Sequence, residues 1–184
     1  MITEKIAYTI YENKCKKLFR TERVERCEKK LFCIMEARIS FESPEIRVTK
    51  YNKDFYFGFY CTTLDAQAKR WATRFDGKGI LNEYRYTPNE ELSVKVFPEM
   101  SEEWLDFIVA CRSGKSHNYD IVEGPMANDT IFNYVQNFVD GKISREAFWD
   151  LARFKKPTHQ ISFHTAKSLT TLKFLKGSEV WDEE

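Results

Sequence analysis

Few side chains in this sequence have both the type and the spacing that chemistry requires. The tripeptide GKS at 114–116 suggests a phosphate-binding loop, but the first glycine of that motif would fall at Val109. His159 and His164 are five residues apart on an expected strand, so they point to opposite faces and do not share a metal ion. The sequence contains no Gly-rich dinucleotide motif, nucleophile elbow or carboxylate-rich metal loop, so we expect no metal site.

Two other patterns leave alternatives open. Cys61 with a distant histidine is compatible with a thiol nucleophile, although a cysteine in an apolar strand is more often a packing residue. In the expected strand near the carboxyl end, side-chain alternation gives two faces: Gln160, Ser162 and His164 on one, and His159, Ile161 and Phe163 on the other. A polar face of this kind suits a strand that lines a cleft, and a solvent-facing strand would have the same pattern.

The composition is typical of a globular protein of one domain. Among 184 residues, 42% are hydrophobic and 15% aromatic, enough to build a core without disulfides or metal. Lys and Arg total 29 against 28 Asp and Glu, which gives no strong nucleic-acid signal. No apolar run reaches the roughly 18 residues of a membrane span, and no export signal is visible. Five cysteines without a C-x-x-C pair indicate free thiols in a reducing cytoplasm.

The first thirty residues differ from the rest of the chain. They hold nine basic and five acidic residues, and Ile2, Ile6 and Ile10 follow a helical i, i+4 spacing. We expect residues 1–30 to form a helical extension with a positive solvent face, and residues 31–184 to form the main domain. A membrane-surface or RNA-binding role for this arm is the alternative.

The main domain mixes strand and helix patterns. Residues 31–41 indicate one strand or two, Pro44 ends the pattern, and an aromatic loop then runs through Gly58 into a strand that ends near Thr63. A helix capped by Asp65 follows, with its buried face listed here: Leu64, Ala68, Trp71, Ala72 and Phe75.

The second half continues without a regular repeat of strand, helix and strand. We expect the strands 80–86, 92–97, 119–124 and 155–165, and a short terminal element at 168–175. Helices are expected after Ser101, over 131–139 with a stop at Gly141, and after Ser144. Interspersed elements of both kinds predict an α+β fold.

Three segments together resemble one family. They are YNKDFYFGFYCTTLDAQAKRWA, YDIVEGPMANDTIFNYV and KKPTHQISFHT, within a resemblance that covers about residues 44–176. They are similar to the bacterial domain-of-unknown-function family 3990, whose members look like ADP-ribosyltransferases. GFYCTTLDAQAKRWA is also similar to the strand and helix of the His-Tyr-Glu class, which includes poly(ADP-ribose) polymerases and diphtheria toxin.

The resemblance implies a split β-sandwich of two small sheets with surrounding helices, and NAD bound between the sheets. It implies that Tyr60 stacks on nicotinamide and that Gln160 takes the late-strand position of the class glutamate, which makes these two the expected catalytic residues. Gly58, Ser162 and Cys33 complete the expected NAD-binding set. Cys33 stands where the class has a first-strand His, and an alternative register places Met35 there.

The chemistry implied by the resemblance is cleavage of the nicotinamide–ribose bond through a cation-like sugar. A flat aromatic ring would hold nicotinamide, and an amide near the ribose 2′-hydroxyl would align the sugar. The expected function is transfer of a single ADP-ribose from NAD to a macromolecule, as a bacterial toxin held by an antitoxin. The alternative is a catalytically inactive relative that acts as a binding or interaction module.

Overall fold

A computed structural model describes residues 28–34, 40–48, 53–74, 77–127, 129–152 and 158–182. Its elements, in chain order, are β1 (Lys29–Cys33), β2 (Phe59–Thr62), α2 (Asp65–Thr73), β3 (Lys78–Tyr86), β4 (Val94–Val96), α3 (Glu102–Arg112), β5 (Ile121–Met126), α4 (Asp129–Val139), α5 (Arg145–Ala152), β6 (Thr158–Phe163), α6 (Ala166–Leu169) and β7 (Leu172–Trp181). The α+β class is confirmed. Most of the expected helical extension, residues 1–27, lies outside the described residues, and the end of that range, Lys29 and Lys30, belongs to β1.

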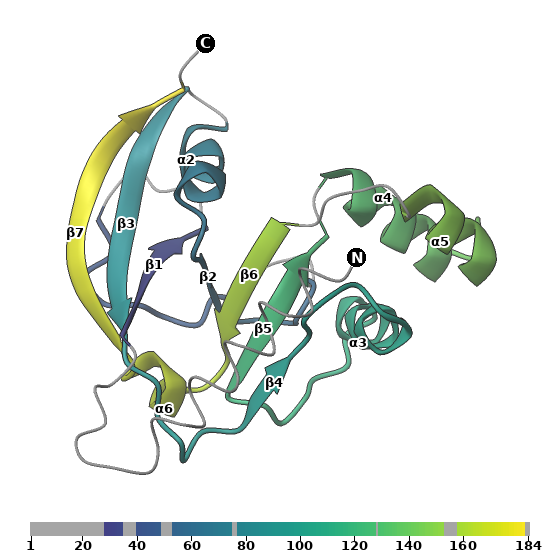
Figure 1. Cartoon of the computed structure of the whole chain (residues 1–184), viewed down its shortest axis with the longest axis horizontal. Helices are drawn as coiled ribbons and strands as arrows, with labels where there is room; N and C mark the ends of the chain where they lie inside the picture. Colours follow the sequence, from purple (N-terminus) through teal and green to yellow (C-terminus); the bar gives the residue numbers. More distant parts are fainter. Residues whose placement is uncertain are drawn as a thin grey trace, which may run out of the picture.

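The strands form one mixed sheet in the order β4-β5-β6-β2-β1-β3-β7. The expectation of two separate sheets is wrong, because β2 pairs with β1 at Cys33↔Cys61 and with β6 at Tyr60↔Ser162. Figure 1 shows the long, curved β3–β7 pair on one side, strands β4 to β6 on the other, and the short β1 and β2 between them. Two short strands thus join the halves that the resemblance had implied to be independent.

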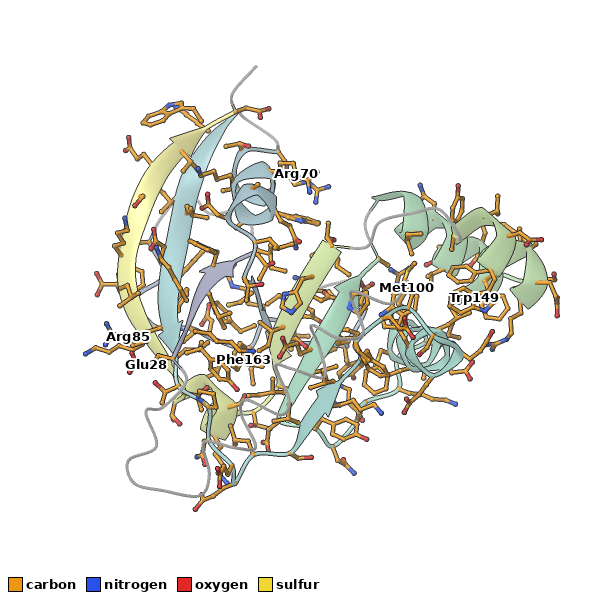
Figure 2. The ribbon with its side chains drawn as sticks, viewed as in Figure 1. Glu28, Arg70, Arg85, Met100, Trp149 and Phe163 are labelled. Carbon is orange, nitrogen blue, oxygen red and sulfur yellow. The ribbon has the colours of Figure 1, made fainter. Side chains whose placement is uncertain are left out.

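One face of this bent sheet encloses an apolar core between its two halves. Phe163 of β6 packs edge-on against Tyr86 of β3, with 5.6 Å between ring centroids, and Figure 2 shows Phe163 near the gap between the halves. Phe59 and Cys61 of β2 belong to the same buried cluster. The closing of the halves on each other explains how aromatic residues distant in sequence become fully buried.

Helices cover the opposite face. α3, α4 and α5 gather beside strands β4 to β6, while α2 lies beside β1 and β3 (Figure 1). Ala68 of α2 packs with Phe32 of β1 and Leu81 of β3. In the other group, Trp104 of α3 is fully buried, and its indole N–H donates to the carbonyl oxygen of Pro125 at 3.0 Å. Tyr60 belongs to this helix-covered side, so the expected site lies under helices and not in the core between the halves.

Helix starts were predicted with mixed success. Ser101 caps α3 as expected, since its hydroxyl accepts from the backbone N–H of Trp104 at 3.2 Å. The prediction of Asp65 as a cap is wrong: Leu64 holds the cap position without a side-chain bond, and Asp65 is the first residue of α2. Asp65 instead forms an i,i+4 ion pair with Lys69 at 3.0 Å, a use of the carboxylate that the same sequence allows.

The expected terminal element of 168–175 is too short. The structure has a helical turn, α6, followed by the ten-residue strand β7, which pairs with β3 along its whole length. β7 is an edge strand whose residues are mostly exposed or half-buried, and its KGSEV stretch lacks the apolar alternation that identifies a strand from sequence. Pairing with β3 supplies backbone hydrogen bonds that stabilise a strand which the side-chain pattern does not predict.

Candidate functional site

The expected site residues on β2 and β6 lie together on one face of the sheet. The two strands are antiparallel neighbours, and Tyr60 stands directly opposite Ser162. Gln160 lies two residues before Ser162, so it shares the same face. The alternation predicted for this segment is therefore confirmed, and Ile161 and Phe163 point into the core on the other side.

Gly58 permits a close backbone approach, as expected. A Cβ atom added there would lie 2.9 Å from the carbonyl oxygen of Phe163 and 3.0 Å from Nδ1 of His164. A real side chain does not fit at those distances. Glycine at this position lets the loop before β2 lie directly against the end of β6.

Tyr60 is buried, with 3% of its surface exposed. Its hydroxyl donates to the carbonyl oxygen of Tyr56 at 2.6 Å and accepts from the backbone N–H of Phe55 at 3.1 Å. Burial, and after it the nearby Asp54 carboxylate, raise the pKa of the Tyr60 phenol well above its ordinary value. The phenol therefore stays protonated and fixes the loop that precedes its own strand.

A buried charged network centred on Asp54 adjoins Tyr60. Arg112 at the end of α3 donates from Nε to Asp54 Oδ1 at 3.1 Å, and its Nη2 donates to the same oxygen. The other oxygen, Oδ2, accepts from the backbone N–H of Ala127 at 2.9 Å and from Nε2 of Gln160 at 3.0 Å. Four donors thus compensate a carboxylate that water hardly reaches, since Asp54 is only 6% exposed.

This network explains why the late-strand position carries an amide. Gln160 Nε2 donates both to Asp54 and to the carbonyl oxygen of Pro125, at 3.0 and 3.3 Å. A glutamate would offer no N–H to either acceptor, and it would place a second negative charge against Asp54. The Gln160 side chain therefore has a structural role here that the sequence did not indicate.

Two histidines hold the loop between Lys53 and Gly58. His117 Nε2 donates to the carbonyl oxygen of Phe55 at 3.0 Å, and His164 Nδ1 donates to that of Phe57 at 2.8 Å. Burial, with a smaller contribution from His117, lowers the pKa of His164 to about 4, and burial also lowers the pKa of His117. Both rings are therefore neutral at pH 7, which leaves Nε2 of His164 as an acceptor for the hydroxyl of Ser162 at 2.8 Å.

The same loop contains an unfavourable backbone conformation. Tyr56 has a φ of 72°, the left-handed region in which glycine is the usual residue. Its carbonyl oxygen accepts from Tyr60, and the neighbouring carbonyls of Phe55 and Phe57 accept from the two histidines. Three consecutive carbonyls are thus held by three side chains, which is how the fold maintains this conformation.

Cys33 lies on the other face of the sheet. It stands opposite Cys61 and belongs to the core between the sheet halves. The next residue, Ile34, shares the buried cluster of Tyr60 and donates its backbone N–H to the carbonyl oxygen of Tyr60 at 3.0 Å. The structure therefore separates Cys33 from the other expected NAD-binding residues, and Met35 lies outside the described residues.

A second candidate region lies on the face opposite to Gln160. An open groove of about 250 Å³ is lined by apolar side chains such as Leu64 and Val96 and by three polar ones, Glu123, Thr158 and His159. His159 Nε2 donates to Glu123 Oε1 at 3.0 Å, and Lys29 Nζ lies 3.7 Å from the same oxygen. Burial opposes ionisation of Glu123, but the hydrogen bond from His159 and the charge of Lys29 outweigh it and lower the pKa of this carboxyl.

Sequence reasoning missed four residues of the Tyr60 site. They are Asp54, Arg112, His117 and Lys53, whose ammonium lies 4.8 Å from the centroid of the Tyr60 ring. Asp54 and Arg112 are 58 positions apart in the sequence. No local spacing could have paired them. The one available signal was the dense aromatic stretch around Asp54, where a lone carboxylate must find buried donors.

Metal sites and membrane spans have no candidates in the part of the chain that the structure describes. There, no three His, Cys, Asp or Glu side chains converge in a way that could hold a metal ion. Nor is any described helix long and apolar enough to cross a bilayer.

Comparison with known proteins identifies the family. Residues 36–174 match the model of the family described as "Protein of unknown function (DUF3990)", and the chain belongs to that family. The match begins after β1, so Cys33 lies outside it. No curated protein and no solved structure matches the chain.

Proposed function

We propose that this protein is an ADP-ribosyltransferase-like NAD-binding protein. The supporting observation is the register of β2 and β6, which places the Tyr60 ring opposite Ser162 and beside Gln160 on one face. An aromatic ring with an adjacent amide and hydroxyl is the combination that could stack nicotinamide and hydrogen-bond a ribose. In this proposal the substrate is NAD, and the product is a macromolecule that carries a single ADP-ribose.

NAD requires a different arrangement of the loop at 53–57. In the structure Tyr60 and Gln160 are almost fully buried, and both contact this loop through hydrogen bonds. In the proposal, NAD therefore binds after the loop moves, and the Tyr60 ring then becomes one wall of the nicotinamide site. The Ser162 hydroxyl, which bonds to His164 Nε2 and to the carbonyl oxygen of Val122 in the structure, would exchange one of these partners for the ribose.

The toxin role belongs to the proposal as well. Transfer to a cellular macromolecule would damage the cell that makes the protein, and an antitoxin protein bound over the loop at 53–57 would keep the site closed. The antitoxin partner is taken from the family resemblance alone.

A second function, as an inactive binding module, is favoured by two placements. Cys33, expected at the histidine position, faces away from Tyr60, and the Gln160 amide already donates to Asp54 and Pro125. A site that holds the reacting sugar poorly can lose on the order of a hundredfold in rate. NAD binding without release of nicotinamide is the expected behaviour of such a protein.

NAD titration of the wild-type chain and of Tyr60→Leu tests the proposal. Loss of the ring should weaken NAD binding by about 1–2 kcal/mol through lost stacking. Tyr60→Phe, which keeps the ring, should retain the affinity. Tyr86→Leu is the matched control, because Tyr86 is a buried tyrosine in the core on the other face of the sheet. Equal NAD affinity in folded wild type and Tyr60→Leu would refute the assignment, and nicotinamide release assayed in parallel decides between transferase and inactive module.

A further inference from the structure

One face of the Tyr60 ring is covered by a positive charge. The Lys53 ammonium lies 4.8 Å from the ring centroid, within the range of an attractive cation–π contact. Lys53 is half-buried at the start of the loop that Tyr60 holds. Burial lowers the pKa of Lys53. Of the smaller effects, those of Cys33 and Asp54 raise this pKa and that of Arg47 lowers it.

Two other lysines over aromatic rings in the described residues have a carboxylate partner. Lys95 lies 4.9 Å from the Phe97 ring centroid and pairs with Glu103, and Lys30 lies 5.2 Å from that of Phe32 and pairs with Glu83. Within the described residues, no carboxylate forms an ion pair with Lys53. The Tyr60 ring attracts this cation, and Cys33 and Asp54 also favour its charged form.

We propose that Lys53 sets the selectivity of this site between the cationic nicotinamide ring of NAD and the neutral ring of NADH. Its ammonium occupies the place on the Tyr60 ring that the cationic ring of NAD would take. This inference depends on the proposed function. Oxidised NAD carries a positive charge on its nicotinamide ring, and the π-face that attracts an ammonium attracts a pyridinium in the same way. Two like charges cannot share one buried ring without strong repulsion, so one must displace the other.

Displacement of Lys53 would open the loop that carries it, which has one cost and one gain. The carbonyls of Phe55 and Phe57 are held by neutral histidines, and the carbonyl between them by Tyr60 itself. Release of the loop would break these bonds but would relieve the left-handed conformation of Tyr56. Lys53 and NAD thus compete for one surface, and the loop follows whichever is bound.

The experiment measures the Kd values of NAD and of NADH, whose dihydronicotinamide ring is uncharged, for wild type, Lys53→Met and Lys53→Arg. Lys53→Met keeps the aliphatic stem and removes the charge, so NAD affinity should rise about tenfold and NADH affinity less than threefold. Lys53→Arg keeps a cation that stacks on aromatic faces at least as well, so NAD should bind no better than to wild type. The matched control is Lys95→Met, a lysine over Phe97 that should leave both affinities unchanged.

The outcomes separate this inference from the proposed function. NAD binding that depends on Tyr60 but is equal in wild type and Lys53→Met overturns the role of Lys53 alone. An equal gain for NAD and NADH in Lys53→Met also overturns it, because the competition would then be steric and not electrostatic. Failure of wild type and of the folded Lys53→Met variant to bind NAD at all overturns the proposed function together with the inference. Thermal unfolding of each variant verifies that it is folded.

Discussion

The charged side chains on one face of strands β5 and β6 are buried, whereas those on the other face are partly exposed. On the Tyr60 face, Asp54 and Arg112 are buried, and each oxygen of the carboxylate accepts hydrogen bonds. On the opposite face, Glu123 and His159 form a pair whose side chains are 23% and 26% exposed at the edge of a groove. The first arrangement must be complete in order to be tolerated, whereas water can replace a missing partner in the second. Stability should therefore depend on the first face far more than on the second.

Arg112→Met should have the largest effect. It leaves the Asp54 carboxylate buried with only neutral donors, and loss of one partner of a buried pair costs about 3–5 kcal/mol. Urea unfolding monitored by tryptophan fluorescence measures the change. The double variant Asp54→Asn with Arg112→Met should recover part of this loss, since no buried charge remains. A loss below about 1 kcal/mol in the single variant would show that water reaches Asp54.

Gln160→Glu should have the next largest effect. The new carboxylate would lie against Asp54 and the carbonyl of Pro125, so its folded pKa would rise above the unfolded value. An acid whose folded pKa is raised destabilises the fold once pH exceeds the unfolded pKa, so the cost should be about 2–4 kcal/mol at pH 7 and smaller at pH 5.

Gln160→Met is the control for this substitution. It removes the two N–H donors without adding charge, and it should cost about 1–2 kcal/mol at both pH values. If the glutamate variant is as stable as the methionine variant at pH 7, Gln160 does not contact a charged Asp54 in solution.

Acidification should destabilise the folded protein through protonation of His164. The imidazole takes up a proton near pH 6.5 when unfolded and only near pH 4 when folded, so the unfolded state binds more protons between these values. The stability that the neutral His164 ring contributes is fully present above pH 6.5. The free energy of unfolding should then fall by up to about 3 kcal/mol as the pH decreases to 4. His117, whose pKa is also lowered, adds to the same trend.

The pH dependence of urea unfolding tests this prediction, with His164→Asn as the comparison. The variant should be less stable at pH 7, but its stability should change much less between pH 6.5 and 5. An equally steep loss in the variant would assign the acid sensitivity to groups other than His164.

Glu123→Gln should have the smallest effect. The partly exposed pair with His159 and the longer contact with Lys29 should together contribute less than about 1 kcal/mol, because water and salt screen such pairs. Urea unfolding at low and at high salt measures this contribution. A loss comparable to that of Arg112→Met would remove the contrast between the two faces.

The sequence predicted most of the local structure on which the site is built. The alternation of Gln160, Ser162 and His164, the close approach at Gly58 and the cap at Ser101 depend on neighbouring residues, and all three are confirmed. Predictions failed where a distant strand decides the outcome: β7 exists because β3 pairs with it, and the halves form one sheet because β2 pairs on both of its edges.

The same distinction between local and long-range features applies to the candidate site. The sequence by itself determined which residues share a face of β6 and that a tyrosine follows a glycine into β2, because strand geometry has a fixed period of two. Only the tertiary structure decided that Cys33 faces the opposite core and that Asp54 meets Arg112 and Gln160. Register between strands and burial of charge depend on contacts across the whole fold, which no local spacing encodes.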